Sequence, residues 1–152
     1  MNYEIVTLQE KIVMGITART NNSAPDMGAV IGGLWNRFYG EGIYEGIPDK
    51  ADEKAIGLYT DYVGDAADDY TVMVCCAVAK EPESSQYEIR RIPAGRYAKF
   101  VVKGDMHRAV AEAWQDIWKM DLPRAFACDF EEYQNDDMEH TEIHLYIGLK
   151  EE

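Results

Sequence analysis

Apolar residues recur along this chain at two spacings, every second position and every third to fourth, which are typical of strands and helices respectively. Tyr3 to Thr20 holds two β-branched apolar runs separated by polar residues 9–11, a pattern that predicts one long or broken strand. Met27 to Phe38 has helical spacing, and Gly40 and Gly42 end it. A helix is therefore expected after the first strand.

The start of this helix carries a capping pattern. Ser23 lies three residues before Asp26, with a proline between them. A serine oxygen and a carboxylate satisfy the free N–H groups of a first turn, and proline is tolerated there. Beyond the helix we expect an irregular connection from Glu41 to Ala55, and then a hairpin of strands from Ile56 to Val63 and from Tyr70 to Ala79.

The same order starts again after residue 86. The spacing predicts strands from Tyr87 to Ile92 and from Arg96 to Lys103, and a helix that opens at Asp105. A last hairpin is expected from strands Ala125 to Tyr133 and Glu142 to Lys150. The second half therefore repeats the β-α-β-β order of the first.

Side chains also match between the two halves. The matching pairs are Met27 with Met106, Trp35 with Trp114, and Tyr62 with Tyr133. We predict one α+β domain over residues 1–152, with repeat one at about 1–80 and repeat two at about 86–152. The repeats would pair about a pseudo-twofold axis, giving an antiparallel sheet, two main helices and a central ligand cleft at their junction.

The charge of the chain narrows the choice of partner. Fifteen Lys and Arg against 28 Asp and Glu give a formal net charge of −13, which repels phosphate backbones and anionic lipid headgroups. We expect neither direct nucleic acid binding nor membrane binding. The same field concentrates small cations near the protein, which favours a cationic organic ligand, although acidity also serves solubility.

Location and cofactors are predicted from what the sequence lacks. It has no apolar stretch of about 20 residues and no signal-peptide pattern at its start, so we expect a cytoplasmic protein. Cys75, Cys76 and Cys128 lie in apolar surroundings and are expected to be reduced core thiols. Metal-ligand spacings and glycine-rich phosphate loops are also missing, so no metal or cofactor is predicted.

Aromatic and acidic side chains are the candidate chemistry. Trp35 and Trp114 can offer flat faces to a planar or cationic ligand, or can simply belong to the core. Strand alternation puts Asp129, Glu131 and Tyr133 on one face. In the last strand it puts residues 142, 144, 146 and 148 on one face, opposite an apolar core face. These polar faces line a cavity or face water, and a carboxylate in such a cavity is either a counter-ion or a general acid or base.

Four short motifs and the duplicated β-α-β-β order resemble a known family. In chain order the motifs are IGGLWNRF, AGRYAKFVVKG, DFEEY and TEIHLYIGLK. Together they resemble the effector-binding domain of the GyrI-like, AraC-type effector-binding superfamily, nearest to its stand-alone YdeE-like and integron-associated members. The resemblance implies a tandem β-α-β-β fold whose cleft binds amphipathic, often cationic, small molecules.

The resemblance also implies site residues. The F-E-x-Y pattern transfers a cleft acid and aromatic to Glu131 and Tyr133, the terminal strand transfers Glu142 and Tyr146, and Trp35 corresponds to the helix tryptophan of the family. His144 stands where many relatives have Glu, which leaves open which carboxylate is the counter-ion. The candidate ligand-binding residues are therefore Trp35, Tyr62, Trp114, Glu131, Tyr133, Glu142, His144 and Tyr146.

Three functions fit these observations. The favoured one is a binding protein for a small hydrophobic or cationic organic ligand, related to the ligand-binding domains of transcription regulators but without a DNA-binding region of its own. The alternatives are a small-molecule hydrolase of the GyrI-like type and a gyrase-inhibitor-like interaction protein, whose protein partner would be gyrase or a regulator. Binding is preferred to catalysis, and no catalytic residue is assigned.

Overall fold

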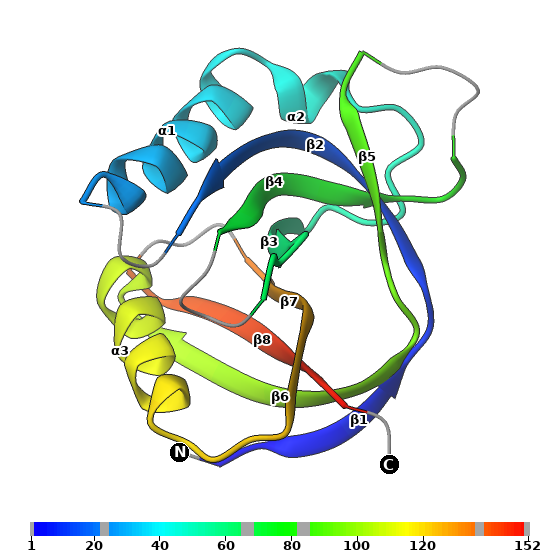
Figure 1. The fold of residues 1–152 in the computed structure, drawn as a ribbon. Coiled ribbons are helices and arrows are strands. Elements are labelled where there is room, and N and C mark those ends of the chain that lie inside the picture. Colours follow the sequence, from blue (N-terminus) through cyan, green and yellow to red (C-terminus); the bar gives the residue numbers. More distant parts are fainter. Residues whose placement is uncertain (1, 22–24, 65–68, 82–85, 136–138, 151–152) are drawn as a thin grey trace.

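The computed structural model describes residues 2–21, 25–64, 69–81, 86–135 and 139–150, and this part of the chain forms an α+β fold of eight strands and three helices (Figure 1). In chain order the elements are β1 (Glu4–Leu8), β2 (Lys11–Thr20), α1 (Met27–Gly40), α2 (Ile43–Gly46), β3 (Ala55–Thr60), β4 (Tyr70–Val78), β5 (Glu88–Ile92), β6 (Gly95–Gly104), α3 (Met106–Trp118), β7 (Arg124–Tyr133) and β8 (Thr141–Leu149). All the predicted strands and both main helices are present. The short helix α2 lies in the segment that was expected to be irregular.

The strands form one sheet in the order β1-β6-β8-β7-β3-β4-β2-β5, and every neighbouring pair is antiparallel. β3 and β7 pair in the middle of the sheet, where Gly57 lies opposite Glu131. If β1 to β4 exchange numbers with β5 to β8, the same order results, read from the other edge of the sheet. This is the order expected of two repeats, and the pseudo-twofold axis between them stays a prediction.

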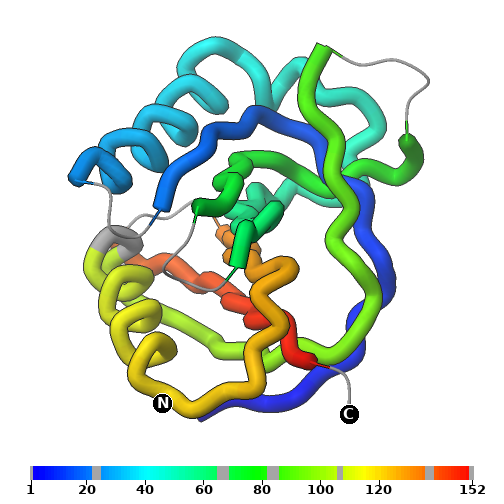
Figure 2. Tube along the Cα trace, viewed as in Figure 1, coloured from blue at the N-terminus to red at the C-terminus, as the bar shows by residue number. Residues whose placement is uncertain are grey.

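The first apolar segment is a broken strand that joins the two halves. β1 pairs with β6, whereas β2 pairs with β4 and β5. Figure 2 shows the dark-blue β1–β2 segment and the green β5–β6 segment running along each other on one side of the molecule. Each half therefore supplies a strand to the edge of the other half.

Helices α1 and α3 cover the two halves of one sheet face (Figure 1). Leu34 and Phe38 of α1 pack on β2 and β4, and Ala113 and Ile117 of α3 pack on β6 and β8. The helices begin at the corresponding residues Met27 and Met106. The Asp105 carboxylate caps α3 by accepting the Arg108 N–H at 3.2 Å, Asp26 makes no such side-chain cap, and Ser23 lies outside the described residues.

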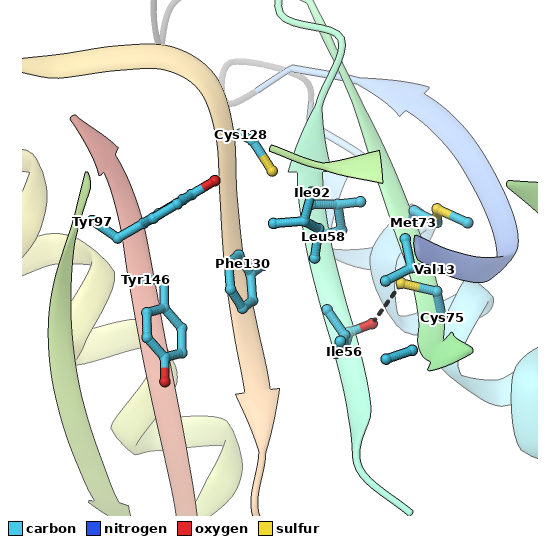
Figure 3. Packing of buried hydrophobic residues seen from close by; sticks show 11 residues of the cluster. Val13, Ile56, Leu58, Met73, Cys75, Ile92, Tyr97, Cys128, Phe130 and Tyr146 are labelled. Atoms are coloured by element: carbon cyan, nitrogen blue, oxygen red, sulfur yellow. Dashed lines mark hydrogen bonds between the residues drawn. The ribbon is translucent and has the colours of Figure 1, made fainter. Parts of the chain in front are cut away.

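The other face of the curled sheet holds a second part of the core (Figure 3). Its members include Leu58, Met73, Phe130 and Tyr146, from four different strands. All three cysteines are buried and free, as predicted for core thiols, and burial raises the pKa of the Cys76 thiol to about 11. None of the described helices is both long enough and apolar enough to cross a membrane.

Candidate functional site

A cleft lies between α1 and α3, above the two central strands of the sheet. Its volume is about 1710 Å³, larger than the roughly 300–1,000 Å³ of a pocket that encloses a drug-sized ligand. The lining includes Met27, Ile31, Trp35 and Tyr39 of α1, Val110, Trp114 and Trp118 of α3, and Tyr59, Tyr62, Tyr70, Arg124, Glu131 and Tyr133. The cleft is therefore a wide aromatic groove with a few polar groups at its base.

Glu131 is the central polar group of this groove. Its side chain is 2 % exposed and accepts three hydrogen bonds. Tyr59 Oη and Trp114 Nε1 donate to Oε2 at 2.9 and 2.6 Å, and Tyr133 Oη donates to Oε1 at 2.9 Å. All three donors are neutral, and no Lys, Arg or His of the described residues forms an ion pair with this carboxylate.

Burial sets the electrostatics of this cluster. Desolvation raises the pKa of the Glu131 carboxyl above its ordinary value, and the hydrogen bonds from Trp114, Tyr133 and Tyr59 oppose that rise. Burial, followed by the charge of Glu131, raises the pKa of Tyr59 and of Tyr133 well above 10, so both phenols stay protonated donors at neutral pH. The carboxylate is thus stabilised by neutral hydrogen-bond donors, and none of its partners among the described residues carries a positive charge.

Strand pairing explains why Glu131 has room to face the groove. Asp129, Glu131 and Tyr133 share one face of β7, as the alternation predicts. On β3, the residue opposite Glu131 is Gly57, which has no side chain. A Cβ atom there would lie 3.0 Å from Glu131 Oε1 and 3.4 Å from Trp35 Cζ2. Gly57 therefore keeps the base of the groove open.

Aromatic rings form the walls around the carboxylate. The Trp35 ring lies 4.9 Å from the Tyr133 ring, and the Tyr59 ring lies 5.3 Å from the Trp114 ring. Tyr70 continues the wall from Tyr59 at 5.9 Å. No pattern in the sequence marks Tyr59, Tyr70 and Gly57 as site residues, because only the pairing of β3 with β7 brings this face of the sheet beside Glu131.

Asp129 forms a second buried cluster at the groove. Arg124 Nη2 donates to its Oδ2 at 2.8 Å, and Tyr62 Oη donates to the same oxygen at 2.6 Å. The Gly148 N–H donates to Oδ1 at 2.9 Å. Unlike Glu131, this carboxylate has a cationic partner. Tyr62 therefore reaches the groove as a side chain anchored by Asp129.

The structure does not bring Glu142, His144 and Tyr146 together with Glu131, so the expected convergence of these polar groups on one cavity is corrected. On β8 the face toward α3 is made by Leu145 and its apolar neighbours, and the alternate residues point to the other side. Glu142 pairs there with His144 at 2.8 Å, and the Tyr146 ring stacks on Phe130 at 4.6 Å (Figure 3). Alternation had predicted the faces correctly but not which of them borders the cleft.

The described side chains of this region are not arranged to hold a metal ion. Within the described ranges, no group of three His, Cys, Asp or Glu side chains lies close enough to hold a metal ion. The polar groups of the groove are carboxylates, phenols, amides, a hydroxyl, an indole N–H, the ammonium of Lys54 and the guanidinium of Arg124, which are groups that can bind organic ligands through charge and hydrogen bonds. The fold and the groove together describe a small-molecule-binding module.

Comparison with known proteins identifies the family of this module. Residues 4–149 match the model of the integron-associated effector binding protein family, so the chain belongs to that family. No curated protein matches the sequence. The family and the aromatic groove agree on the binding of a small molecule.

Solved structures share the fold over nearly the whole chain. An integron cassette protein from the mobile metagenome of Vibrio cholerae is 25% identical with a TM-score of 0.79, over 97% of this chain and 95% of that one. SAV2435, solved with tetraphenylphosphonium bound, is 21% identical with a TM-score of 0.77, over 97% and 94%. A putative transcription regulation protein from Staphylococcus aureus is 20% identical with a TM-score of 0.70, over 97% and 99%.

Proposed function

We propose that this protein binds hydrophobic organic cations in the groove between α1 and α3, with Glu131 as the counter-charge. The observation that carries the proposal is the carboxylate of Glu131, a residue that is 2 % exposed, at the base of an aromatic groove, where every donor to it among the described residues is neutral. Buried charges are normally paired with an opposite charge. A cationic ligand would supply that missing partner.

The walls of the groove suit a cation whose charge is delocalised. Such an ion is weakly hydrated and loses little on leaving water, and the faces of tryptophan and tyrosine attract positive charge. At about 5 Å and an effective dielectric constant of about 20, its attraction to a carboxylate is roughly 3 kcal/mol. A metal ion or a small ammonium, being strongly hydrated, gains less from the same site.

Two further observations support a cation. The net charge of −13 raises the local concentration of positively charged molecules around the protein. SAV2435, which shares the fold, has been solved with the lipophilic cation tetraphenylphosphonium. That compound is therefore the natural first probe for this chain.

The test is the binding of tetraphenylphosphonium to the wild type and to Glu131→Gln, measured by isothermal titration calorimetry. Gln keeps the shape and can still accept from Tyr59 and Trp114, so the fold is expected to survive. Loss of the charge is expected to weaken binding at least about tenfold. Tetraphenylborate, which has the same shape and the opposite charge, is expected not to bind.

Glu142→Gln is the matched control, because it removes one carboxylate from the opposite face of the sheet. Its affinity for tetraphenylphosphonium should equal that of the wild type. Equal affinity in Glu131→Gln and wild type would show that Glu131 is not the counter-charge. Equal binding of the phosphonium and the borate would show that the groove does not select cations at all.

Hydrolysis is the second candidate, favoured by the raised pKa of Glu131 beside two phenols. A carboxyl of this kind can act as general acid or base. Mass spectrometry of a strained electrophilic substrate after incubation would separate the two functions. Turnover that disappears in Glu131→Gln would support catalysis, and an unchanged compound would support binding alone.

A further inference from the structure

Another polar group of the groove is the guanidinium of Arg124. This side chain lines the groove and is 8 % exposed, which is unusual for arginine. Its Nη2 donates to Asp129 at 2.8 Å. Asp129 also accepts from Tyr62 and from the backbone of Gly148, so three donors share this carboxylate.

Arg124 has more donors than the described residues satisfy. A guanidinium carries five N–H groups in a planar fork. Among the described residues only Nη2 has an acceptor, the Asp129 carboxylate. Nε is buried without an acceptor and out of reach of a ligand, whereas Nη1 has no acceptor but is not buried, so its two N–H groups are the donors open to the groove. The ring of Phe126 covers the guanidinium at 4.4 Å and accepts no conventional hydrogen bond.

The backbone of β7 is irregular next to Arg124. The register of β7 with β8 shifts between Arg124 and Asp129, and Phe126 within the shift has a φ of 52°. Positive φ is strained for a bulky aromatic residue. Bulges of this kind re-aim side chains, and strained backbone is concentrated at functional sites.

Arg124 and Glu131 are oppositely charged residues that line the same groove. Asp129, which holds Arg124, and Glu131 share a strand face two residues apart, a separation of about 7 Å. Tyrosine rings run from one cluster to the other, with Tyr59 to Tyr70 at 5.9 Å and Tyr70 to Tyr62 at 5.6 Å. A single organic molecule lying on these rings would reach both Arg124 and Glu131.

We propose that the ligand of this groove carries, besides its cationic centre, a neutral oxygen acceptor such as an ester, amide or ketone carbonyl, which accepts a hydrogen bond from Arg124. The inference rests on the proposed function, since Glu131 holds the cationic end. A neutral acceptor fits better than an anion because Asp129 already balances the charge of Arg124, and the whole chain carries −13. The carbonyl would lie on the order of 7 Å from the cationic centre.

Two matched probes test this assignment. One is a triphenylphosphonium with a four-carbon chain that ends in an ethyl ester, and the other carries an alkyl chain of the same number of heavy atoms. Titration calorimetry is expected to give the ester an advantage of about tenfold on the wild type. In the paired variant Arg124→Met with Asp129→Asn, which keeps the site electrically balanced, the ratio of the two affinities should fall to about one.

An NMR measurement keeps the test decisive if the paired variant fails to fold. The Nη–H resonances of Arg124 in the ¹⁵N-labelled wild type are expected to shift with the ester probe and not with the alkyl probe. A carboxylate in place of the ester is expected to bind more weakly than the ester.

The outcomes separate the two proposals. Equal affinity of the ester and alkyl probes for the wild type, or an ester advantage that survives in the paired variant, overturns the role of Arg124. If the alkyl probe at the same time binds and weakens in Glu131→Gln, the proposed function stands. If neither phosphonium binds, the proposed function itself fails.

Discussion

At the scale of single residues, the groove depends on how one carboxylate is left without a cationic partner. Glu131 and Asp129 are both buried on the same strand face, yet Asp129 pairs with Arg124, whereas Glu131 accepts only from neutral donors within the described part of the chain. Ionised Glu131 therefore costs folding free energy that a bound cation recovers. This difference between the two carboxylates is the basis for proposing Glu131, and not Asp129, as the counter-charge of a cationic ligand.

Cation affinity should depend on pH through Glu131. Its pKa in the folded protein is raised by burial, and only the ionised form attracts a cation. Affinity for tetraphenylphosphonium is expected to fall as pH is lowered through the raised pKa, with proton release on binding in that range. Calorimetry at several pH values, in buffers of different ionisation enthalpy, measures both effects.

The raised pKa of Glu131 also determines how the stability of the protein changes with pH. A carboxyl whose pKa is higher in the folded state holds its proton longer there than in the unfolded chain, so its ionisation lowers the free energy of unfolding as pH rises from the ordinary value of Glu through the raised one. Glu131→Gln should flatten this part of the profile in urea unfolding. An identical pH dependence of affinity and stability in the variant would contradict the assignment.

At the scale of elements, β3 and β7 bring the groove together and the two helices give it walls. Gly57 on β3 matters because it faces Glu131 across the strand pair. In α1, Gly28 and Gly32 line the groove and lie in open surroundings, where an added Cβ would meet nothing within 4 Å. The groove therefore has space for an added side chain at Gly28 and Gly32, but not at Gly57.

Gly57→Ala is expected to weaken phosphonium binding by about threefold to tenfold and to cost roughly 1 kcal/mol of stability. The new Cβ would force Glu131 or Trp35 to move, since it lies at 3.0 and 3.4 Å from them. Gly33→Ala, in a helix interior with no atom within 4 Å of the new methyl group, is the control. It should leave affinity unchanged and stabilise the protein by about 0.5–1 kcal/mol. Unchanged binding in Gly57→Ala would mean that the base of the groove tolerates a side chain.

At the scale of the whole molecule, the halves are interlocked through the sheet. β1 of the first half pairs with β6, and β5 of the second half pairs with β2. The central pair of β3 and β7 adds a third connection. Neither half can therefore keep its sheet edges and its core covered without the other.

Unfolding is expected to be one cooperative transition. Urea unfolding followed by tryptophan fluorescence, which reports Trp35 in one half and Trp114 and Trp118 in the other, should coincide with unfolding followed by far-UV circular dichroism. A chain of residues 1–80 alone should give the spectrum of an unfolded peptide. Two separate transitions, or a folded fragment, would show that the repeats are independent units.

Local spacing was sufficient to predict the strands and the two main helices, but not the short helix α2, and it predicted one side of the site. Alternation placed Glu131 and Tyr133 on a common face, and the helical stripes located α1 and α3 with their tryptophans Trp35 and Trp114. These are properties of neighbours a few residues apart, because side-chain direction in strands and helices follows from backbone geometry alone. The acidic balance likewise needs no structure, since net charge is a sum over residues.

Long-range pairing decided the rest. Only the order of the sheet reveals that Tyr146 and Glu142 face away from the groove, that Gly57 lies opposite Glu131, and that Arg124 reaches the cluster around Asp129. Two faces of a strand are equivalent until other strands and helices cover one of them, and register is set by partners far away in the chain. Which of the two buried acids has a cationic side chain beside it among the described residues is therefore a property of the folded protein.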